Sequence, residues 1–420
     1  MSIFIKNIKK LVNVRETAPS VPLRGEEMLS LPCLDDAWLL TDGESIAAVG
    51  RMQDLKPEEL EAMEISADEV IDADGRMVFP SYCDSHTHLV YAGSREMEFM
   101  DKLRGLSYQE IARRGGGILN SVELLHNTPE DDLLQQTLVR AWEIISLGTG
   151  AVEIKSGYGL TVEDEVKMLR VARRVGEETP LKVRATFLGA HAVPARYKGN
   201  REGYVDEIIR DIMPAVAAEG LADYVDIFVE EGFFTVEDAS RIFEAAARYG
   251  MVPKVHANQM SFSGGVQVGV RYGAASVDHL EFTGPDEFKA LQGSGTIATL
   301  LPGATFFLDM DYPRAKDMLE YGLPLAIASN YNPGSCPSGD MKFMMALAMI
   351  KMRLTPETVL NAATVNGSFA MGVASEYGSI TPGKKASFFI TKKIPSYEFV
   401  PYSFTSQLIE NIILNGKIYG

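Results

Sequence analysis

Histidine and cysteine are scarce in this chain, and it has neither an excess of positive charge nor a long apolar run. Its 420 residues include six histidines and three cysteines, and 57 acidic against 40 basic residues give a formal net charge of −17. A nucleic-acid backbone attracts proteins rich in Lys and Arg, so this charge argues against nucleic-acid binding. No apolar run approaches the roughly 20 residues of a membrane-spanning helix.

The three cysteines do not indicate a metal site. Cys33, Cys83 and Cys336 are far apart, odd in number and outside any metal-binding spacing. They are typical of free thiols in a reducing cytoplasm. The opening stretch MSIFIKNIKKLVNV alternates and carries lysines throughout, so it lacks the continuous apolar segment of a signal peptide. We therefore expect a cytoplasmic protein.

Both ends of the chain predict β structure. WLLTDGESIAAVG places two apolar runs around Asp42-Gly43, and NIILNGKIYG does the same around Asn415-Gly416. Both patterns are typical of β-hairpins. We expect residues 1–75 and 376–420 to fold together into a small β-sandwich domain.

Residues 76–375 alternate short apolar runs with amphipathic segments. TVEDEVKMLRVARRVGEE and VEDASRIFEAAARYG, for example, have apolar residues at helical spacing. Eight such run-then-helix units predict a (β/α)8 barrel of the α/β class, whose chemistry lies at the C-terminal ends of its strands.

The histidines fall at these strand ends. Five of the six do so: His86, His88, His191, His256 and His279. His86 and His88 are two residues apart in a predicted strand, so their side chains face the same way and can share one metal ion. The alternative to a metal site is that these histidines are ordinary polar residues satisfied by hydrogen bonds. Histidines that only fill a core would not gather at strand ends. We favour a metal site, and we place the sixth histidine, His126, on the surface.

These motifs resemble a known family. DSHTHLVYAGSRE, the GGGI of residues 115–118, EIKSGYGL, LGAHAVP, VDHLE and NPGS are similar to segments of imidazolonepropionases, in the single-metal branch of the amidohydrolase superfamily. The resemblance covers nearly the whole chain. It implies hydrolysis of a small molecule, 4-imidazolone-5-propanoate, to N-formimidoyl-L-glutamate in histidine degradation, with one Zn²⁺ or Fe³⁺ ion. Members are often homodimers, and nothing in the sequence fixes the oligomeric state.

The resemblance also implies roles for single residues. The metal ligands would be His86, His88 and His256, with position 330 completing the site. Arg95 would pair with the substrate propanoate, for which a guanidinium is well shaped. His279 would assist water attack or stabilise the oxyanion. The remaining substrate contacts would be Tyr108, Tyr158, His191, Gln259, Asn332, Gly334 and Ser335.

Two positions depart from the family pattern. Asn330 stands where an aspartate is expected after the eighth strand, and Gln259 stands where a glutamate is expected after His256. An amide keeps the shape of the acid but cannot carry a proton. Gln259 can still recognise substrate, so we interpret it as a tolerated variant. At Asn330 three explanations stay open: low activity, a base supplied by His279, or a deliberate alteration that traps a complex.

Two other functions stay open. Another single-metal cyclic amidohydrolase, such as a deaminase, would not need Arg95 if its substrate lacked a carboxylate. A catalytically impaired barrel that acts only in binding would fit Asn330 and Gln259. Lys155 follows the second strand, where the lysine that bridges two metal ions is not expected, so we interpret it as structural.

Overall fold

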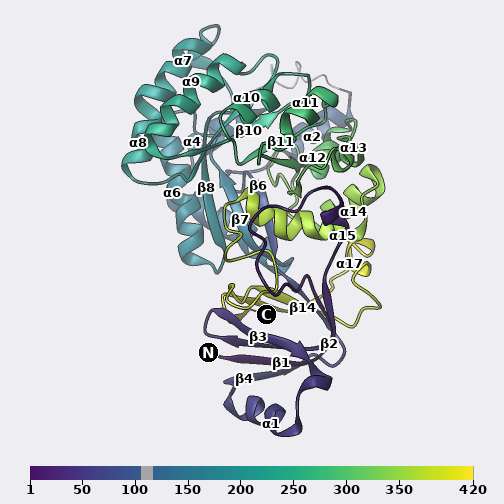
Figure 1. Ribbon diagram of the computed structural model, residues 1–420. Coiled ribbons are helices and arrows are strands. Elements are labelled where there is room, and N and C mark those ends of the chain that lie inside the picture. Colours follow the sequence, from purple (N-terminus) through teal and green to yellow (C-terminus); the bar gives the residue numbers. More distant parts are fainter. Residues whose placement is uncertain (106–116, 420) are drawn as a thin grey trace.

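Two sheets organise the molecule. The structure, a computed structural model, describes residues 1–105 and 117–419. One sheet is built from the two ends of the chain and lies at the bottom of Figure 1, and the other is built from the middle of the chain and lies above it. The predicted fold class, a (β/α)8 barrel with a small β domain built from both chain ends, is confirmed. The strands of the chain ends, expected as a β-sandwich, are hydrogen-bonded in one sheet.

The small sheet joins distant segments of the chain. Its strands are β1 (Ile3–Val12), β2 (Cys33–Asp42), β3 (Ser45–Arg51), β4 (Glu69–Asp72), β5 (Met77–Pro80), β14 (Phe388–Thr391), β15 (Ile409–Leu414) and β16 (Lys417–Tyr419). They pair in the order β16-β15-β14-β5-β1-β2-β3, with β4 beside β1. The antiparallel pair β14–β5 therefore holds the end of the chain against its beginning.

Both predicted hairpins are present, and their turns touch. Asp42 pairs with Ser45 across the first turn, and Leu414 pairs with Lys417 across the second. A Cβ atom on Gly416 would lie 1.9 Å from the carbonyl oxygen of Gly43, so this contact requires glycine. The domain boundaries stay a prediction, and β5 belongs to the sheet of the chain ends although it begins at Met77.

The second sheet is the barrel. Its strands are β6 (Tyr82–Thr87), β7 (Thr149–Lys155), β8 (Lys182–Ala190), β9 (Tyr224–Val229), β10 (Val252–Ala257), β11 (Ser276–His279), β12 (Ile297–Leu300) and β13 (Leu325–Ile327). Neighbours in the sequence are neighbours in the sheet, and each recorded pair is parallel. A parallel bridge between Thr87 and Tyr331 brings the segment after β13 back to β6 and closes the ring.

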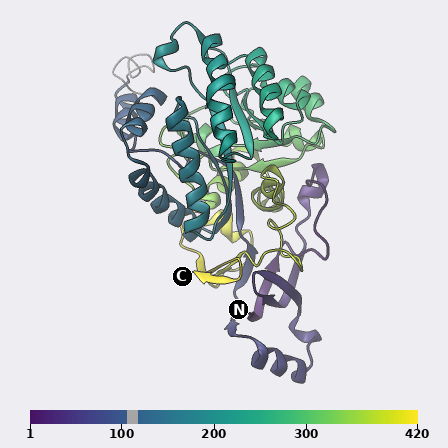
Figure 2. The ribbon, with the colours of Figure 1, turned by 90° about the vertical axis from the view of Figure 1, so that its left-hand side faces the viewer.

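Helices cover the outside of the barrel (Figure 2). The α-helices of the described residues, of which α1 lies beside the small sheet, are α1 (Pro57–Ser66), α2 (Glu96–Leu103), α4 (Ile118–His126), α5 (Glu130–Ser146), α6 (Val162–Glu178), α7 (Arg201–Glu207), α8 (Met213–Ala218), α9 (Val236–Ala246), α10 (Gly265–Arg271), α11 (Pro285–Leu291), α12 (Pro302–Leu308), α13 (Ala315–Glu320), α14 (Met341–Met352), α15 (Pro356–Asn361), α16 (Gly367–Ala370) and α17 (Phe399–Tyr402). The predicted helix after β7 is α6. Thr161 caps it by accepting a hydrogen bond from the Asp164 amide, and Val166 and Leu169 pack into the core.

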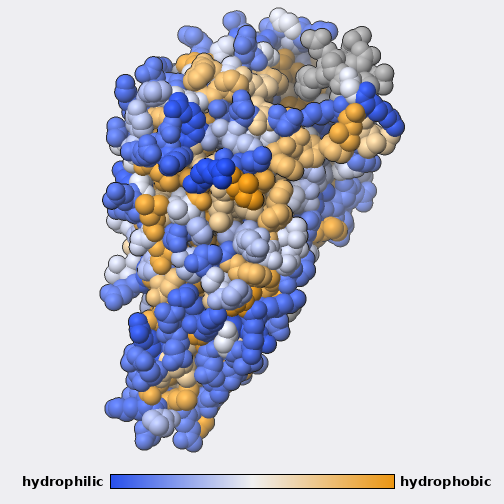
Figure 3. All heavy atoms as spheres, turned by 90° about the vertical axis from the view of Figure 1, so that its right-hand side faces the viewer, coloured by the Kyte–Doolittle hydropathy of each residue, from blue (hydrophilic) through white to orange (hydrophobic). Residues whose placement is uncertain are grey.

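The surface is mixed in character. Figure 3 shows a mostly hydrophilic tip at the small-sheet end and patches of apolar side chains over the barrel. Among the described residues, no helix combines the length and the apolar character needed to cross a bilayer.

Candidate metal centre and active site

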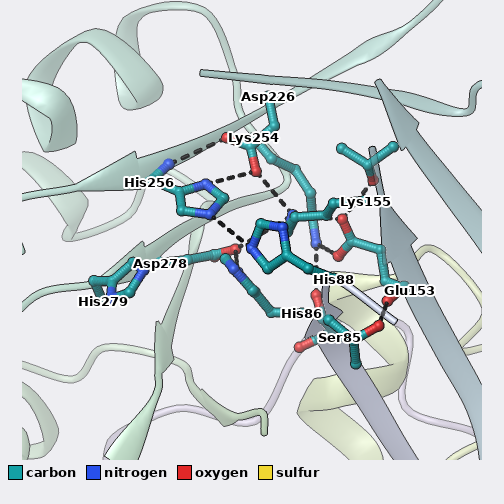
Figure 4. A network of polar contacts seen from close by, with 12 residues as sticks. Ser85, His86, His88, Glu153, Lys155, Asp226, Lys254, His256, Asp278 and His279 are labelled. Atoms are coloured by element: carbon teal, nitrogen blue, oxygen red, sulfur yellow. Dashed lines mark hydrogen bonds and ion pairs between the residues drawn. The ribbon is translucent and has the colours of Figure 1, made fainter. Parts of the chain in front are cut away.

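Five histidines converge at the C-terminal end of the barrel. Figure 4 shows four of them, His86, His88, His256 and His279. His86 lies near the end of β6 and His88 directly follows that strand. His191 follows β8, His256 lies in β10, and His279 ends β11. All five are buried. The sixth, His126, ends α4 with 67% of its side chain exposed, and its Nδ1 lies 2.7 Å from Asp164, as expected for a surface residue.

The histidine rings lie close enough together to share an ion. The centroids of His86 and His256 are 4.4 Å apart, and the Nε2 atoms of His88 and His256 are 3.3 Å apart. Within the described part of the chain, two overlapping sets of three could each hold a metal: His86, His256 and His279, and His88, His191 and His256. The structure therefore brings together the predicted ligands, and it also brings in His191 and His279 at similar range.

Carboxylates behind the rings fix two of them. His86 Nδ1 donates to Asp278 Oδ2 at 2.6 Å, and His256 Nδ1 lies 3.0 Å from Asp226 Oδ2. The Nε2 atom of His86 is buried, and it has no hydrogen-bond partner among the residues that the structure describes. A buried imidazole nitrogen without a partner needs an explanation, and a ligated metal ion supplies one. The residues present therefore fit a metal centre.

The rings of His86, His88 and His191 are held neutral, as metal binding requires. Burial lowers the pKa of His86 well below its ordinary value, and the charge on Lys155 lowers it further. Burial also lowers the pKa of His88 well below its ordinary value, and it lowers the pKa of His191 to about 3.

A layer of buried charges supports the centre from within the barrel. It contains Glu153, Lys155, Asp226, Lys254 and Asp278, all inaccessible to solvent or nearly so. Lys155 Nζ lies 2.6 Å from Glu153, 2.8 Å from Asp226 and 3.8 Å from Asp278. Lys254 pairs with Glu153 and also donates to the Ser85 carbonyl at 3.0 Å. With all five ionised, three carboxylates and two ammonium groups leave this layer one negative charge, which favours a cation above it.

Lys155 is held by these ion pairs. Burial alone would lower its pKa, but Asp226 and Glu153 outweigh burial and hold it above the ordinary value. Burial likewise opposes ionisation of Asp226, but His256 and Lys155 outweigh it and hold the pKa of Asp226 well below its ordinary range. Lys155 is therefore a protonated partner of carboxylates, in agreement with the structural interpretation.

A cavity of about 500 Å³ opens above the histidines. Its lining includes these residues that the sequence singled out: His88, Arg95, Tyr158, His191, His256, Gln259, His279, Asn330, Asn332, Gly334 and Ser335. Tyr108 lies outside the described residues. Sequence reasoning missed Glu98 and a wall of apolar residues that includes Phe228 and Phe307. The sequence spacing could have indicated a contact between Glu98 and Arg95, because the two residues are one helical turn apart.

The turn after β13 holds Asn330 firmly. Asn330 is in the left-handed region (φ 56°), which Asn and Asp tolerate better than most residues, and it is 2% exposed. The backbone N–H of Asn330 donates a hydrogen bond to the His86 carbonyl oxygen at 2.9 Å. Asn332 organises the turn, because its Oδ1 accepts hydrogen bonds from the amides of Gly334 and Ser335, both at 2.8 Å.

Comparisons with known proteins agree with this geometry. The model of the amidohydrolase family matches residues 77–419. A zinc-containing atrazine chlorohydrolase from Arthrobacter aurescens TC1 has a similar fold, with a TM-score of 0.71 at 14% identity over 99% of this chain and 94% of its own. An adenosine deaminase from Xanthomonas campestris with bound zinc has a TM-score of 0.68 at 16% identity, over 99% and 92% of the two chains.

The chain therefore belongs to the amidohydrolase family. Several relatives that match it over nearly its full length are named imidazolonepropionase. The one from Flavobacterium johnsoniae is 50% identical over 418 residues and the full length of both chains. The one from Alkaliphilus metalliredigens is 37% identical over 419 residues, which cover 100% of this chain and 98% of its own. The resemblance drawn from the sequence motifs is confirmed.

Proposed function

We propose that this protein is a metal-dependent hydrolase that opens the ring of 4-imidazolone-5-propanoate to give N-formimidoyl-L-glutamate. The observation that carries the proposal is the convergence of buried histidines and Arg95 on one cavity. The 50% identity to an imidazolonepropionase over the full length of both chains supports the choice of substrate.

We assign one Zn²⁺ or Fe³⁺ ion to His86, His88 and His256, with the side-chain oxygen of Asn330 as a weaker fourth ligand. Three imidazoles leave room for water and substrate, as a catalytic metal needs. When bound, such an ion polarises the ring carbonyl and acidifies a water molecule toward a pKa of about 7. Asp278 and Asp226 orient the two rings that they contact.

The cavity walls orient the substrate. Arg95 binds the propanoate carboxylate. Tyr158 and His191 lie against the ring, and their own rings are 5.4 Å apart between centroids. Gln259 recognises the ring through its amide, and the turn formed by Asn332, Gly334 and Ser335 closes the site around the bound molecule. Tyr108 keeps the role that the resemblance implies, as a prediction outside the described residues.

Ring opening adds one water across a carbon–nitrogen bond. The water oxygen bonds to the ring carbonyl carbon, that carbon's bond to the ring nitrogen breaks, and the nitrogen leaves with a proton. Neither Asn330 nor Gln259 can take up the water's proton. We assign His279, which lines the cavity, to this step, either as the group that accepts the proton or as the donor that stabilises the oxyanion.

Metal content and ring opening, measured on the same purified protein, test the proposal. We expect one equivalent of metal and formation of N-formimidoyl-L-glutamate. His256→Ala should abolish both, whereas His126→Ala, the matched change at the exposed histidine, should alter neither. Bound metal without turnover, with imidazole-4-propanoate still binding, would instead favour the binding-only alternative that Asn330 and Gln259 suggest. The homodimer stays a prediction, which sedimentation analysis tests.

A further inference from the structure

Arg95 is already engaged by a carboxylate of its own chain. Glu98 lies one turn further along α2, and both side chains line the cavity. Glu98 Oε2 accepts hydrogen bonds from Arg95 Nε at 2.8 Å and Nη2 at 2.7 Å. The two side chains are 13% and 16% exposed, so water screens this pair less than it screens a surface ion pair.

Glu98 is itself fixed from the opposite side. Its Oε2 also accepts from the Gly117 amide at 3.0 Å, and its Oε1 accepts from Asn120 Nδ2 at 3.0 Å. These donors come from the start of α4, so the carboxylate ties α2 to α4. A carboxylate held by four donors is a rigid support for the guanidinium that it contacts.

Gly334 leaves room for the other edge of the guanidinium. A Cβ atom at this position would lie 2.1 Å from Arg95 Nη1 and 2.8 Å from its central carbon. The guanidinium therefore packs against the backbone of the turn after β13. Glu98 occupies the Nε–Nη2 edge, and Nη1 faces the turn that also carries Asn330 and Asn332.

We propose that Glu98 is a positioning residue that fixes Arg95 at one distance from the histidines and so selects the chain length of the substrate's carboxylate arm. The inference rests on the proposed function for the role of Arg95. The Arg95–Glu98 pair has no net charge, so it produces no strong positive field. The cavity therefore selects an anion through the position of the guanidinium edge that Glu98 leaves free to donate hydrogen bonds.

Binding of imidazole-4-propanoate and of imidazole to the metal-loaded protein, measured by calorimetry, tests this. Glu98→Gln removes the charge but keeps the shape, so Arg95 should lose its fixed position. We expect the Kd for the propanoate to rise about 10- to 100-fold, the worth of a hydrogen bond to a charged group. The Kd for imidazole should stay unchanged. Glu96→Gln, a change at an exposed glutamate of the same helix, is the matched control and should leave both Kd values unchanged.

A double-mutant cycle separates positioning from a general structural role. If Glu98 acts through Arg95, Glu98→Gln should have no further effect on binding in an Arg95→Ala background. Discrimination against the acetate and butanoate analogues should also shrink in Glu98→Gln. Equal weakening of both ligands, or additive effects in the cycle, would overturn the proposal.

Tighter binding of the propanoate to Glu98→Gln would also overturn it, by showing that Glu98 competes with the ligand for Arg95. Because these measurements follow binding, they stay informative if ring opening itself is absent. A parent protein that binds imidazole-4-propanoate no more tightly than imidazole would instead count against the proposed carboxylate-bearing substrate.

Discussion

Replacing Asn330 by aspartate should restore the acid that the family pattern places after the eighth strand. The position is rigid, because its backbone is hydrogen-bonded to His86 and its side chain is buried. Asn330 Nδ2 lies 3.4 Å from the Ser335 hydroxyl oxygen, a long contact, and that hydroxyl can instead donate to a carboxylate. An aspartate, being nearly isosteric, would therefore occupy the same place without rebuilding the turn.

The expected gain follows from charge and proton transfer. Three neutral histidines around a divalent ion leave a local charge of +2, and an aspartate would reduce it to +1. The aspartate would also accept the proton of the attacking water, which an amide cannot do. A positioned acid–base group is worth about 10²–10⁴-fold, or roughly 3–5 kcal/mol of activation free energy. We expect kcat to rise by that factor, with little change in KM.

The assay is kcat for ring opening at saturating metal, in the parent and in Asn330→Asp. Gln259→Glu serves as the comparison, and its effect should be smaller if that position mainly recognises the ring. Metal affinity should also rise in Asn330→Asp, because a charged ligand replaces a neutral one. If the parent is already fully active and Asn330→Asp leaves kcat unchanged, another group such as His279 is the base, and the role assigned to position 330 is wrong.

Further changes test the remaining parts of the site and fold. Arg95→Ala should raise KM far more for 4-imidazolone-5-propanoate than for an uncharged imidazolone; equal effects would show that Arg95 serves the fold. A strong chelator should abolish ring opening and lower Tm, and added Zn²⁺ or Fe³⁺ should restore both, whereas activity that survives complete metal removal would refute the metal assignment. Lys155→Met leaves two buried carboxylates short of a partner, so the free energy of unfolding should fall by about 3–5 kcal/mol; urea denaturation measures this, and a loss below ~1 kcal/mol would contradict the importance of the charge layer. Burial lowers the pKa of Lys384 to about 8, so above that pH the unfolded chain binds more protons than the folded chain. The stability of the parent protein relative to Lys384→Met should therefore rise from pH 8 to 10. A difference in urea midpoint that stays constant over this range would refute the lowered pKa.

The parts of the site that lie on single strands could be predicted from the sequence. His86 lies in β6 and His88 directly follows it, His256 is the last residue but one of β10, and His279 ends β11. The rule that barrel chemistry lies at C-terminal strand ends was therefore enough to group them. The hairpins of the small sheet were predictable for a similar reason, because their turns are local in sequence.

The buried charge layer was not predicted, because it depends on contacts between strands. Glu153 and Lys254 are 101 residues apart and meet only when β7 and β10 are placed in the same barrel. The sequence did mark both residues as unusual, because ionisable residues are rare inside buried apolar strands. Their partners could not be identified without knowing how the strands align with one another in the barrel. The contact between Arg95 and Gly334 needed the closed barrel for the same reason.

The bridge between Thr87 and Tyr331 places the active site on the seam where the first and last barrel strands join. The His88 amide donates to the Tyr331 carbonyl, and Ser329 donates to Asp84, 245 residues away in the chain. During synthesis His86 and His88 emerge long before this seam can form, so the centre is complete only after the last strand docks. Local opening of the seam would also take the site apart. Amide hydrogen exchange at His88 and Asn330 should therefore slow on metal binding, while amides at the far hairpins keep their rates.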